Sequence, residues 1–413
     1  MKVLLIGSGG REHALATGLS ADKSVTELHV APGNPGIKEI AVLHPISISD
    51  NQAIVDLAKS LAVDLVVIGP EMPLVNGVAD VLRAQGIAVF GPSKAAAQLE
   101  GSKHFAKGVM RDAGVPTAKS FTCENQKEIE RALDTFGAPY VVKDDGLAVG
   151  KGVVVTEDRE IALQHALSCK RVVIEEYLKG PEISLFGISD GKNILPMQPA
   201  QDFKRAYDHD DGPNTGGMGA YSPLPWAPTN IVEDTYTQVL APMIAEMAAR
   251  GTPFVGLLYA GLAVTDRGIR VIEFNARFGD PETQVLIPRL RTPLGQLLYK
   301  AATGNLIDST LQWSDDSAVT VVLAANGYPA DVKSGDEISN LNAVNGVTIF
   351  HAGTKDDGGL KSAGGRVLTV TGVGSDLTEA RDKAYRTVSQ IKLAGSFYRN
   401  DIALNASVAE KGN

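Results

Sequence analysis

The chain has 413 residues, a length that predicts about two to four compact domains. Apolar residues make up 44% and charged residues 21%, so a large core can form and wholesale disorder is excluded. The 39 Lys and Arg against 48 Asp and Glu give a formal net charge of −9. This balance argues against nucleic acid as the main partner, because such binding relies on clustered cations.

The cysteine content and the hydropathy pattern indicate a compartment. Cys123 and Cys169 stand far apart and form no CxxC pair, so neither a disulfide framework nor a zinc site is predicted. No apolar run approaches the ~18 residues that cross a membrane, and no secretory leader is recognisable. We therefore expect a cytoplasmic protein that has no membrane partner.

The first hundred residues alternate short β-branched runs with helix-like segments, which predicts a parallel sheet covered by helices. Four strands are predicted, over residues 3–6, 28–30, 65–68 and 87–90. Each ends at turn-forming residues, such as Gly69-Pro70-Glu71 after the third. Ligands of open α/β sheets bind at the carboxyl ends of strands, so these turns are expected to line one rim of a crevice.

The first of these turns, Gly7-Ser8-Gly9-Gly10-Arg11-Glu12, opens a helix. A dinucleotide fingerprint would need glycine at position 12, so NAD is disfavoured. Free N–H groups and the helix dipole favour a single phosphate beside Gly9 and Gly10. A merely tight strand-to-helix turn is the alternative.

Beyond residue 101, helices are predicted over 103–113 and 124–136, and two strands over 140–143 and 153–155. A loop that contains Gly146, Gly150, Lys151 and Gly152 joins these strands. Its spacing differs from the Walker A motif, so it is no P-loop. We interpret it as a flap that folds backbone N–H groups over a polyphosphate and that ATP orders, with charge from Lys143 and Lys151. A plain flexible hairpin is the alternative.

Further strands are predicted over 172–176, 183–188, 256–264 and 269–274. Between them lies a long polar loop, about 201–222, which is either an active-site lid or a disordered linker; its length favours a lid. Residues from about 318 to 413 are expected to form a separate α+β unit.

The strand that ends near residue 275 places alternate polar residues on one face. Glu273 and Asn275 offer hard oxygen ligands suited to Mg²⁺, and Arg277 can hold an anionic oxygen. A solvated edge strand with an ion pair is the competing interpretation.

Together these segments resemble the phosphoribosylamine-glycine ligases, also called glycinamide ribonucleotide synthetases, of the ATP-grasp superfamily. The resemblance covers essentially the whole chain. Its motifs, in the family's order, are GSGGREHA, APGNPG, GPEMPLVNG, QLEGSK, GLAVGKGV, QDFKRA, DGPNTGGMGAYSP, VIEFNARFGDPETQ, FHAGT and GGRVL.

The resemblance implies a multidomain α/β and α+β fold. A Rossmann-like N-terminal domain would cover 1–101, and the ATP-grasp region 102–316, with a mobile subdomain at about 118–190. A small C-terminal α+β domain would cover 317–413. The sequence does not determine the oligomeric state, and a monomer is the working expectation.

The resemblance also implies a reaction. ATP phosphorylates the glycine carboxylate, and the amine of 5-phosphoribosylamine attacks the resulting acyl phosphate. The products are glycinamide ribonucleotide, ADP and phosphate, a step of de novo purine biosynthesis. Two alternatives stay open: a related ATP-grasp carboxylase or ligase that uses another acid, and a nucleotide-binding protein without turnover.

Site residues are implied by the same likeness. Mg²⁺ or Mn²⁺ would be held by Glu273 and Asn275. ATP would be bound by Lys103, Lys143, Gly146, Gly150, Lys151, Gly152, Glu175, Glu176, Tyr177, Leu178 and Glu182. The catalytic residues would be Arg277, Lys143 and Asp202. Glycine and phosphoribosylamine would meet Gly9, Gly10, Gly69, Pro70, Glu71, Lys204 and Arg277.

Two positions depart from the family pattern, which usually has a small residue at 144 and alanine at 149. This chain has Asp144 and Val149. A carboxylate that faced inward beside Lys143 would repel phosphate. Strand alternation is expected to point Asp144 away from the face of Lys143.

Overall fold

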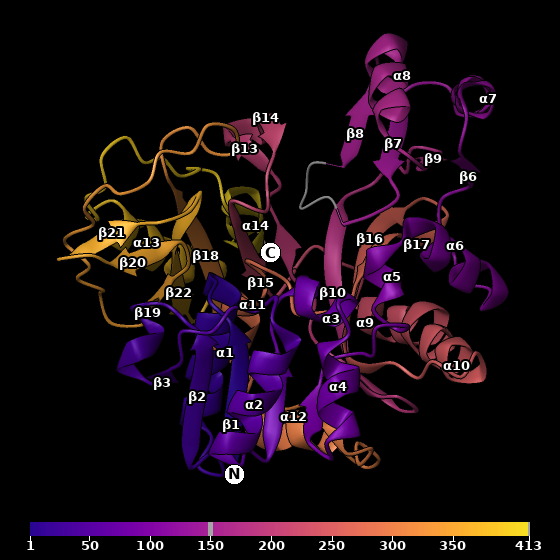
Figure 1. The fold of residues 1–413 in the computed structure, drawn as a ribbon. Coiled ribbons are helices and arrows are strands. Elements are labelled where there is room, and N and C mark those ends of the chain that lie inside the picture. Colours follow the sequence, from indigo (N-terminus) through magenta and orange to yellow (C-terminus); the bar gives the residue numbers. More distant parts are fainter. Residues whose placement is uncertain (148–151, 412–413) are drawn as a thin grey trace.

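The N-terminal part of the chain forms a five-stranded parallel sheet. The computed structural model describes residues 1–147 and 152–411 (Figure 1). The sheet order is β3-β2-β1-β4-β5, and all four predicted strands are confirmed. The two-residue β3 was not predicted, because so short a run carries no periodicity. The strands are β1 (Lys2–Gly7), β2 (Glu27–Pro32), β3 (Val42–Leu43), β4 (Leu65–Ile68) and β5 (Ala88–Phe90).

Helices on both faces bury this sheet. The strand interiors are continuous apolar runs, as in sheets covered on both sides. The helices of this part are α1 (Gly10–Ala21), α2 (Asn51–Leu61), α3 (Glu71–Val75) and α4 (Val78–Ala84). Helices α1 and α3 begin directly after β1 and β4, so their N-termini lie at the carboxyl ends of these strands.

A second sheet, ordered β6-β9-β7-β8, is antiparallel and stands above the rest of the molecule in Figure 1. Side-chain caps fix the starts of its helices: Asn125 accepts the Glu128 N–H, and Asp158 accepts those of Glu160 and Ile161. The elements are β6 (Ser120–Cys123), α7 (Gln126–Phe136), β7 (Tyr140–Asp144), β8 (Val153–Thr156), α8 (Arg159–Ser168) and β9 (Val172–Glu175). The chain enters this sheet through α5 (Gln98–Gly101) and α6 (Lys103–Asp112).

A third sheet, ordered β11-β10-β16-β17, is antiparallel and almost fully buried along β10 and β16. Its elements are β10 (Glu182–Asp190), β11 (Ile194–Pro196), β16 (Val255–Thr265) and β17 (Gly268–Asn275). The helices of this region are α9 (Ile231–Thr235), α10 (Ala241–Ala249), α11 (Thr283–Leu286) and α12 (Leu294–Ala302). The apolar strands predicted here are confirmed.

The fourth sheet, ordered β12-β15-β18-β22-β19, corrects one expectation. The segment 201–222, predicted as a polar loop, contains β12 (Gln201–Asp202), β13 (Arg205–Tyr207), β14 (Asp211–Asn214) and β15 (Gly219–Ser222). Strand β15 is buried throughout and pairs with β18, so the sheet of the C-terminal unit extends into this segment. Sequence periodicity missed β15 because its glycine and small residues resemble a turn. The other elements are β18 (Ser317–Ala324), β19 (Val347–His351), β20 (Thr354–Asp356), β21 (Leu360–Ser362), β22 (Arg366–Gly374), α13 (Leu377–Val388) and α14 (Leu404–Lys411).

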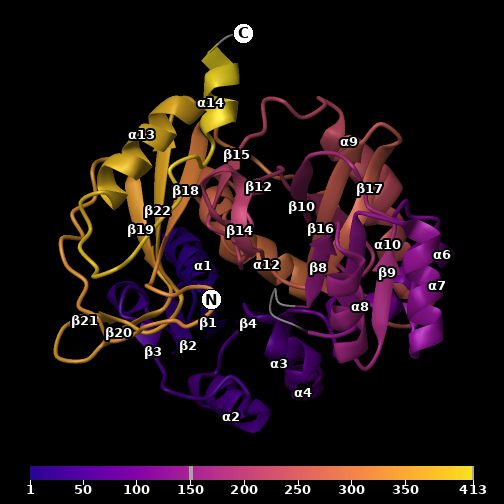
Figure 2. The ribbon, with the colours of Figure 1, turned by 90° about the horizontal axis from the view of Figure 1, so that it is seen from above.

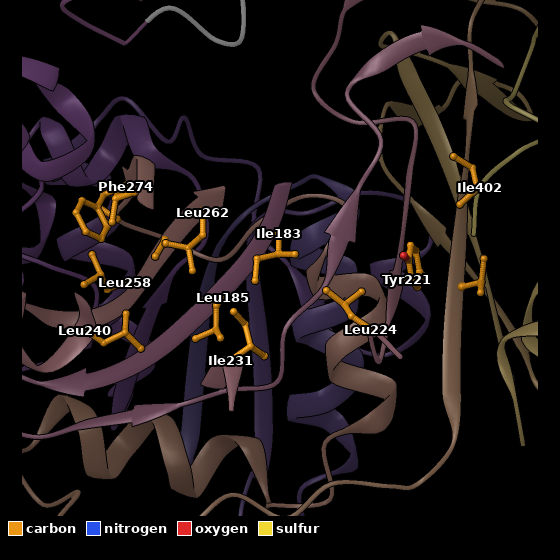
Figure 3. Packing of buried hydrophobic residues seen from close by; sticks show 14 of the residues in the cluster. Ile183, Leu185, Tyr221, Leu224, Ile231, Leu240, Leu258, Leu262, Phe274 and Ile402 are labelled. Atoms are coloured by element: carbon orange, nitrogen blue, oxygen red, sulfur yellow. The ribbon is translucent and has the colours of Figure 1, made fainter. Parts of the chain in front are cut away.

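One buried cluster joins the third and fourth sheets. Figure 3 follows it from Phe274 and Leu258 past Leu224 and Tyr221 to Ile402. Figure 2, seen from above, shows β18, β22 and β19 on one side of β12 and β15, and the third sheet on the other side. Because these side chains pack together, the two sheets are held as one body. Among the described residues, no helix is long and apolar enough to cross a membrane.

Candidate active site

The N-terminal rim of the site is shaped by Glu12. Its carboxylate accepts the Gly9 N–H at 2.6 Å and the Arg11 Nε–H at 2.5 Å. A Cβ on Gly69 would lie 2.2 Å from Glu12 Oε1, so only glycine fits there. Glu12, whose presence argued against a dinucleotide fingerprint, therefore explains the glycine at position 69, and also that at position 7, where a Cβ would lie 2.5 Å from Glu12 Cγ. Pro70 stands at the N-cap position of α3, which opens with Glu71.

Arg277 joins this rim to the central sheet. Its guanidinium pairs with Glu71 at 3.4 Å and with Glu100 at 3.1 Å. Burial opposes ionisation of Glu71, but Arg277 and Arg11 outweigh it and lower the Glu71 pKa. Burial likewise opposes the charge of Arg277, yet Glu100 and Glu71 raise its pKa. The cation therefore persists, and its Nε faces Glu71 Oε2 as an ion pair without forming a hydrogen bond within the described residues.

A bulge in β17 aims the predicted metal ligands. Gly261 pairs with Glu273 and the next residue, Leu262, pairs with Val271, so Ile272 is left out of the ladder. The bulge allows Val271 and Phe274, three positions apart, both to be buried. Glu273 and Asn275 consequently share the opposite, partly exposed face. Glu273 and Asn275 thus share one face, as the alternation predicted. The bulge shifts the alternation by one residue after Val271, so that Phe274 is buried.

Lys143 lies directly beside this bulge. Its Nζ donates to the Ile272 carbonyl at 2.8 Å and pairs with Glu175 Oε2 at 3.0 Å. Lys107 holds the other carboxylate oxygen of Glu175, also at 3.0 Å. Burial lowers the pKa of Lys107, although Glu175 opposes the shift. Glu175, expected near adenine, thus has its side chain between two lysines. Sequence reasoning missed Lys107, although it lies one turn after Lys103 on the same helix.

The base of the glycine loop is tied to the start of α6. Lys103 Nζ donates to the Gly146 carbonyl at 3.0 Å. Asp145 accepts from Ser102 Oγ, from the His104 N–H at 3.0 Å and from Arg171 Nε at 2.5 Å. Sequence reasoning did not single out Asp145. Gly152, at the far side of the loop, accepts the Asp144 N–H at 2.7 Å, and Gly150 and Lys151 lie outside the described residues.

Asp144 lies close to Cys169, away from Lys143. Burial, followed by the negative charge of Asp144, raises the pKa of the Cys169 thiol. Lys143 faces Glu175 and Ile272 instead. The expectation that strand alternation separates these two side chains is confirmed.

Residues 176–178, the expected adenine hinge, form a coil between β9 and β10. Glu176 exchanges two hydrogen bonds with the Lys119 backbone, one of them through its side chain. Tyr177 is exposed, and Leu178 is half-buried. The Glu176 N–H is therefore already paired, and the main chain of Tyr177 and Leu178 is the part of this coil that can face a ligand.

The segment after β12 brings a cation to the same region. Lys204 Nζ pairs with Glu182 Oε2 at 2.6 Å. Burial opposes the Lys204 charge, but Asp202, Glu182, Tyr259 and Glu273 raise its pKa. Burial raises the pKa of Asp202 to about 7 even though Lys204 opposes the shift. The disordered-linker alternative for this segment is therefore wrong.

Three further polar residues at the site were missed. Glu282 is buried and accepts hydrogen bonds from Tyr259 OH at 3.0 Å and Ser184 Oγ at 3.2 Å. Tyr259 stands opposite Asn275 in the β16–β17 ladder. Asp280 pairs with Arg366 at 3.4 Å. The signal was available, because Asp280 and Glu282 follow the polar strand end directly.

The side-chain oxygen atoms of Glu273 and Asn275 suit a hard cation that is also bound by oxygen atoms of the substrate. No three His, Cys, Asp or Glu residues converge on a metal position in residues 1–147 and 152–411. Glu273 and Asn275 would therefore hold an ion together with phosphate oxygens, which is the usual manner for Mg²⁺.

Comparison with known proteins decides the family. Three models of phosphoribosylglycinamide synthetase match in order: the N domain over residues 1–100, the ATP-grasp (A) domain over 101–283 and the C domain over 318–405. The chain belongs to the phosphoribosylamine-glycine ligase family. It is accordingly an ATP-dependent ligase with an ATP-grasp fold, and the expected multidomain fold class is confirmed.

Individual relatives of this family span the whole chain. The phosphoribosylamine-glycine ligase of Streptomyces coelicolor is 61% identical over 99% of this chain and 100% of its own. That of Mycobacterium tuberculosis is 52% identical, over 98% and 99%. The crystal structure of the Thermotoga maritima ligase is 34% identical, with a TM-score of 0.85 over 98% of this chain and 100% of that one.

A more distant likeness concerns the fold alone. The biotin carboxylase of Campylobacter jejuni superposes with a TM-score of 0.74 at 17% identity, over 99% of this chain and 98% of that one. The large difference in identity disfavours the carboxylase alternative.

Proposed function

We propose that this protein ligates glycine to 5-phosphoribosylamine with ATP and Mg²⁺ or Mn²⁺. Glycyl phosphate forms first, and the products are glycinamide ribonucleotide, ADP and phosphate, in purine biosynthesis. The observation that carries the proposal is the gathering of Lys143, Lys204 and Arg277 around the Glu273 strand, in a chain whose relatives are named for this reaction.

The charges of the substrates explain why such a cluster is needed. ATP supplies the phosphoryl group. Both the ATP phosphates and the glycine carboxylate are negatively charged, so they repel each other. Fixed cations in a partly buried site offset this repulsion before the two can approach. We assign Lys103 and Lys143 to the ATP phosphates, with Gly146, Gly152 and the undescribed Gly150 and Lys151 covering them.

The remaining ATP contacts belong to the coil after β9. Main-chain groups of Tyr177 and Leu178 would face adenine, and Glu182 the ribose hydroxyls. The Glu175 side chain, held by Lys107 and Lys143, would keep Lys143 in place. Glu273 and Asn275 would share the divalent cation with the phosphates.

Acceptor binding is assigned to the rim where α1 begins. The start of α1 at Gly10 favours the phosphate of phosphoribosylamine, beside Gly9, whose own N–H is held by Glu12. Gly69, Pro70 and Glu71 would line the sugar, and Glu71 is already ordered by Arg277.

Glycine and its activated carboxylate are assigned to Arg277, Lys204 and Asp202. The guanidinium of Arg277, which already faces the carboxylates of Glu71 and Glu100, suits an anionic carboxylate oxygen of the substrate. Asp202, with a pKa of about 7, can hold a proton near neutrality and so accept one from the attacking amine.

The proposal is tested by phosphate release with glycine, ATP and freshly generated phosphoribosylamine, each omitted in turn. Release is expected only when all three are present. Replacing glycine with other small acids should reduce release strongly. Turnover with another acid, or with none, would contradict the proposal.

Glu273→Ala tests the metal assignment. We expect loss of turnover without loss of the fold, because this side chain is partly exposed and lies beside the bulge rather than in the core. Circular dichroism checks the fold, and Mg²⁺ titration of the residual rate checks the metal. A ligation rate near that of the wild type would refute the assignment.

The monomeric state and the cytosolic location remain expectations. Sedimentation would check the monomeric state.

A further inference from the structure

The motif Tyr398-Arg399-Asn400-Asp401-Ile402 has no part in the proposed function, yet it holds an unusual residue. Arg399 is 1% exposed and is the largest of the fully buried side chains described. A buried guanidinium is costly unless it is paired and hydrogen-bonded. Asp401 pairs with it through two parallel bonds, Nε to Oδ1 at 2.8 Å and Nη2 to Oδ2 at 2.7 Å.

The third nitrogen of Arg399 reaches a different part of the chain. Nη1 donates to Asp210 Oδ1 at 2.8 Å and to the Arg205 carbonyl at 3.1 Å. Both partners belong to the hairpin formed by β13 and β14, which Figure 1 places beside the C-terminal unit. Arg399 therefore bridges two segments that are almost two hundred positions apart.

Its neighbours hold the same hairpin. Asn400 donates to Asp208 through its N–H at 2.6 Å and through Nδ2 at 2.9 Å. The His209 N–H donates to Asp401 Oδ2 at 2.8 Å. We call residues Arg399, Asn400 and Asp401 the latch, because each binds the hairpin tip.

The tip has a backbone that needs such support. His209 and Asp210 are consecutive left-handed residues, with φ of 62° and 56°. Non-glycine residues adopt this conformation uncommonly, and they retain it when the surroundings enforce it. The latch binds both, at the His209 N–H and the Asp210 carboxylate.

The latch also holds both neighbours of Lys204. Arg399 bonds the Arg205 carbonyl, and its guanidinium carbon lies 4.9 Å from the centre of the Phe203 ring. From the other strand, Thr215 donates its N–H and its hydroxyl to the Lys204 carbonyl, at 2.7 and 2.8 Å. The Lys204 backbone is thus fixed on three sides while its amine pairs with Glu182.

We propose that Arg399 is a positioning residue, which holds Lys204 at the glycine end of the active site through the hairpin. This inference rests on the proposed role of Lys204. Arg399 does not touch substrate; it fixes the main chain from which the lysine extends. Its effect should consequently be larger in glycine use than in ATP binding, to which Lys204 is connected only through Glu182.

The main test is Arg399→Lys, which keeps the charge but cannot form the parallel bonds or the stack. Displacement of Lys204 should lower kcat/KM for glycine about tenfold or more, since small misplacements cost up to about a hundredfold. The KM for ATP should stay within about twofold, and amide exchange over residues 203–214 should rise.

A double-mutant cycle separates positioning from a general structural role. If Arg399 acts through Lys204, then Arg399→Lys added to Lys204→Ala should lower kcat/KM for glycine no further than Lys204→Ala alone. Effects that multiply would overturn the proposal, as would normal glycine kinetics of Arg399→Lys.

Two more variants guard against misfolding. Asp210→Asn removes one latch partner at a side chain that is 71% exposed, and it should produce a smaller change in the same direction. Asn125→Ala removes the side-chain cap of α7, a helix of the second sheet away from the latch, and should leave glycine kinetics unchanged. An enzyme without glycine-dependent phosphate release would overturn the proposed function instead. The exchange measurement would still decide whether the latch holds the hairpin.

Discussion

At the scale of single residues, three buried cations of this protein are met by carboxylates. Arg277, Lys143 and Arg399 are each paired with carboxylates. His13 and His351 are different, because their rings lie beside each other and neither is paired with a carboxylate of the described residues. The His351 N–H donates to His13 Nδ1 at 2.8 Å. Burial, and then His351, lowers the pKa of His13 to about 3, and burial lowers that of His351 to about 4.

This pair predicts a pH dependence of stability. Both pKa values are lower in the folded state than the unfolded value of 6.5. The unfolded chain therefore binds more protons between pH 6.5 and these values, so the free energy of unfolding falls as the pH falls through that window. Each histidine adds a slope of up to about 1.4 kcal/mol per pH unit. His13→Gln keeps an acceptor for the His351 N–H and should remove one contribution.

Urea unfolding between pH 7 and 5 measures the effect. The wild type should lose stability faster than His13→Gln as the pH falls. His104→Gln, at an exposed histidine, is the matched control and should follow the wild type. Equal slopes for the wild type and His13→Gln would show that His13 is not held neutral.

At the scale of elements, helix α6 and the glycine loop are built as a unit. The N-terminal N–H groups of α6 are satisfied by Ser102 within the chain's own turn and by Asp145 from the loop base. Lys103, the first residue of α6, holds the loop in return. A helix start therefore fixes where the loop begins.

Asp145→Asn should loosen that loop base. It removes the charge that pairs with Arg171 and weakens the bond to the His104 N–H. A lost cap is worth ~1 kcal/mol, which corresponds to about a fivefold rise in the KM for ATP. Initial rates at varied ATP measure it.

The control for this variant is Asn125→Ala. It removes the side-chain cap of α7, which belongs to the same region as the second sheet, but it lies outside the glycine loop. It should lower stability by a similar amount and leave the KM for ATP unchanged. If both variants raise the KM equally, the effect is general destabilisation rather than the loop base.

At the scale of the whole molecule, the sheet that contains the C-terminal strands begins in the middle of the chain. Strand β18 is buried at every position and lies between β15 and β22. The expected boundary at residue 317, which stays a prediction, would cut this sheet beside β18. Arg366 adds a second connection by donating to the carbonyls of Gly216 and Asp280, at 2.6 and 2.7 Å.

An isolated fragment of residues 317–413 is therefore expected not to fold cooperatively. Without β15, one edge of β18 would be unpaired and its apolar side chains uncovered. Thermal melting followed by circular dichroism should show no sigmoidal transition, and co-expression with residues 1–316 should restore one. A cooperative melt of the fragment alone would contradict this prediction.

The amino-acid sequence by itself determined where the apolar strands lie along the chain. It also determined which polar residues stand at the end of the strand near residue 275. Apolar runs such as 65–68 and 256–264 are long and uniform, so local pattern is sufficient for them. The polar residues Glu273 and Asn275 stand out for the same reason, because they interrupt such a run.

Tertiary structure alone decided the pairings that local pattern cannot contain. The bulge at Ile272 depends on β16, and the position of Glu175 depends on two lysines from other elements. Strand β15 and the latch each join segments far apart in the chain. Periodicity reports which side of its own element a residue faces, whereas the partner on that side is fixed only when distant segments pack together.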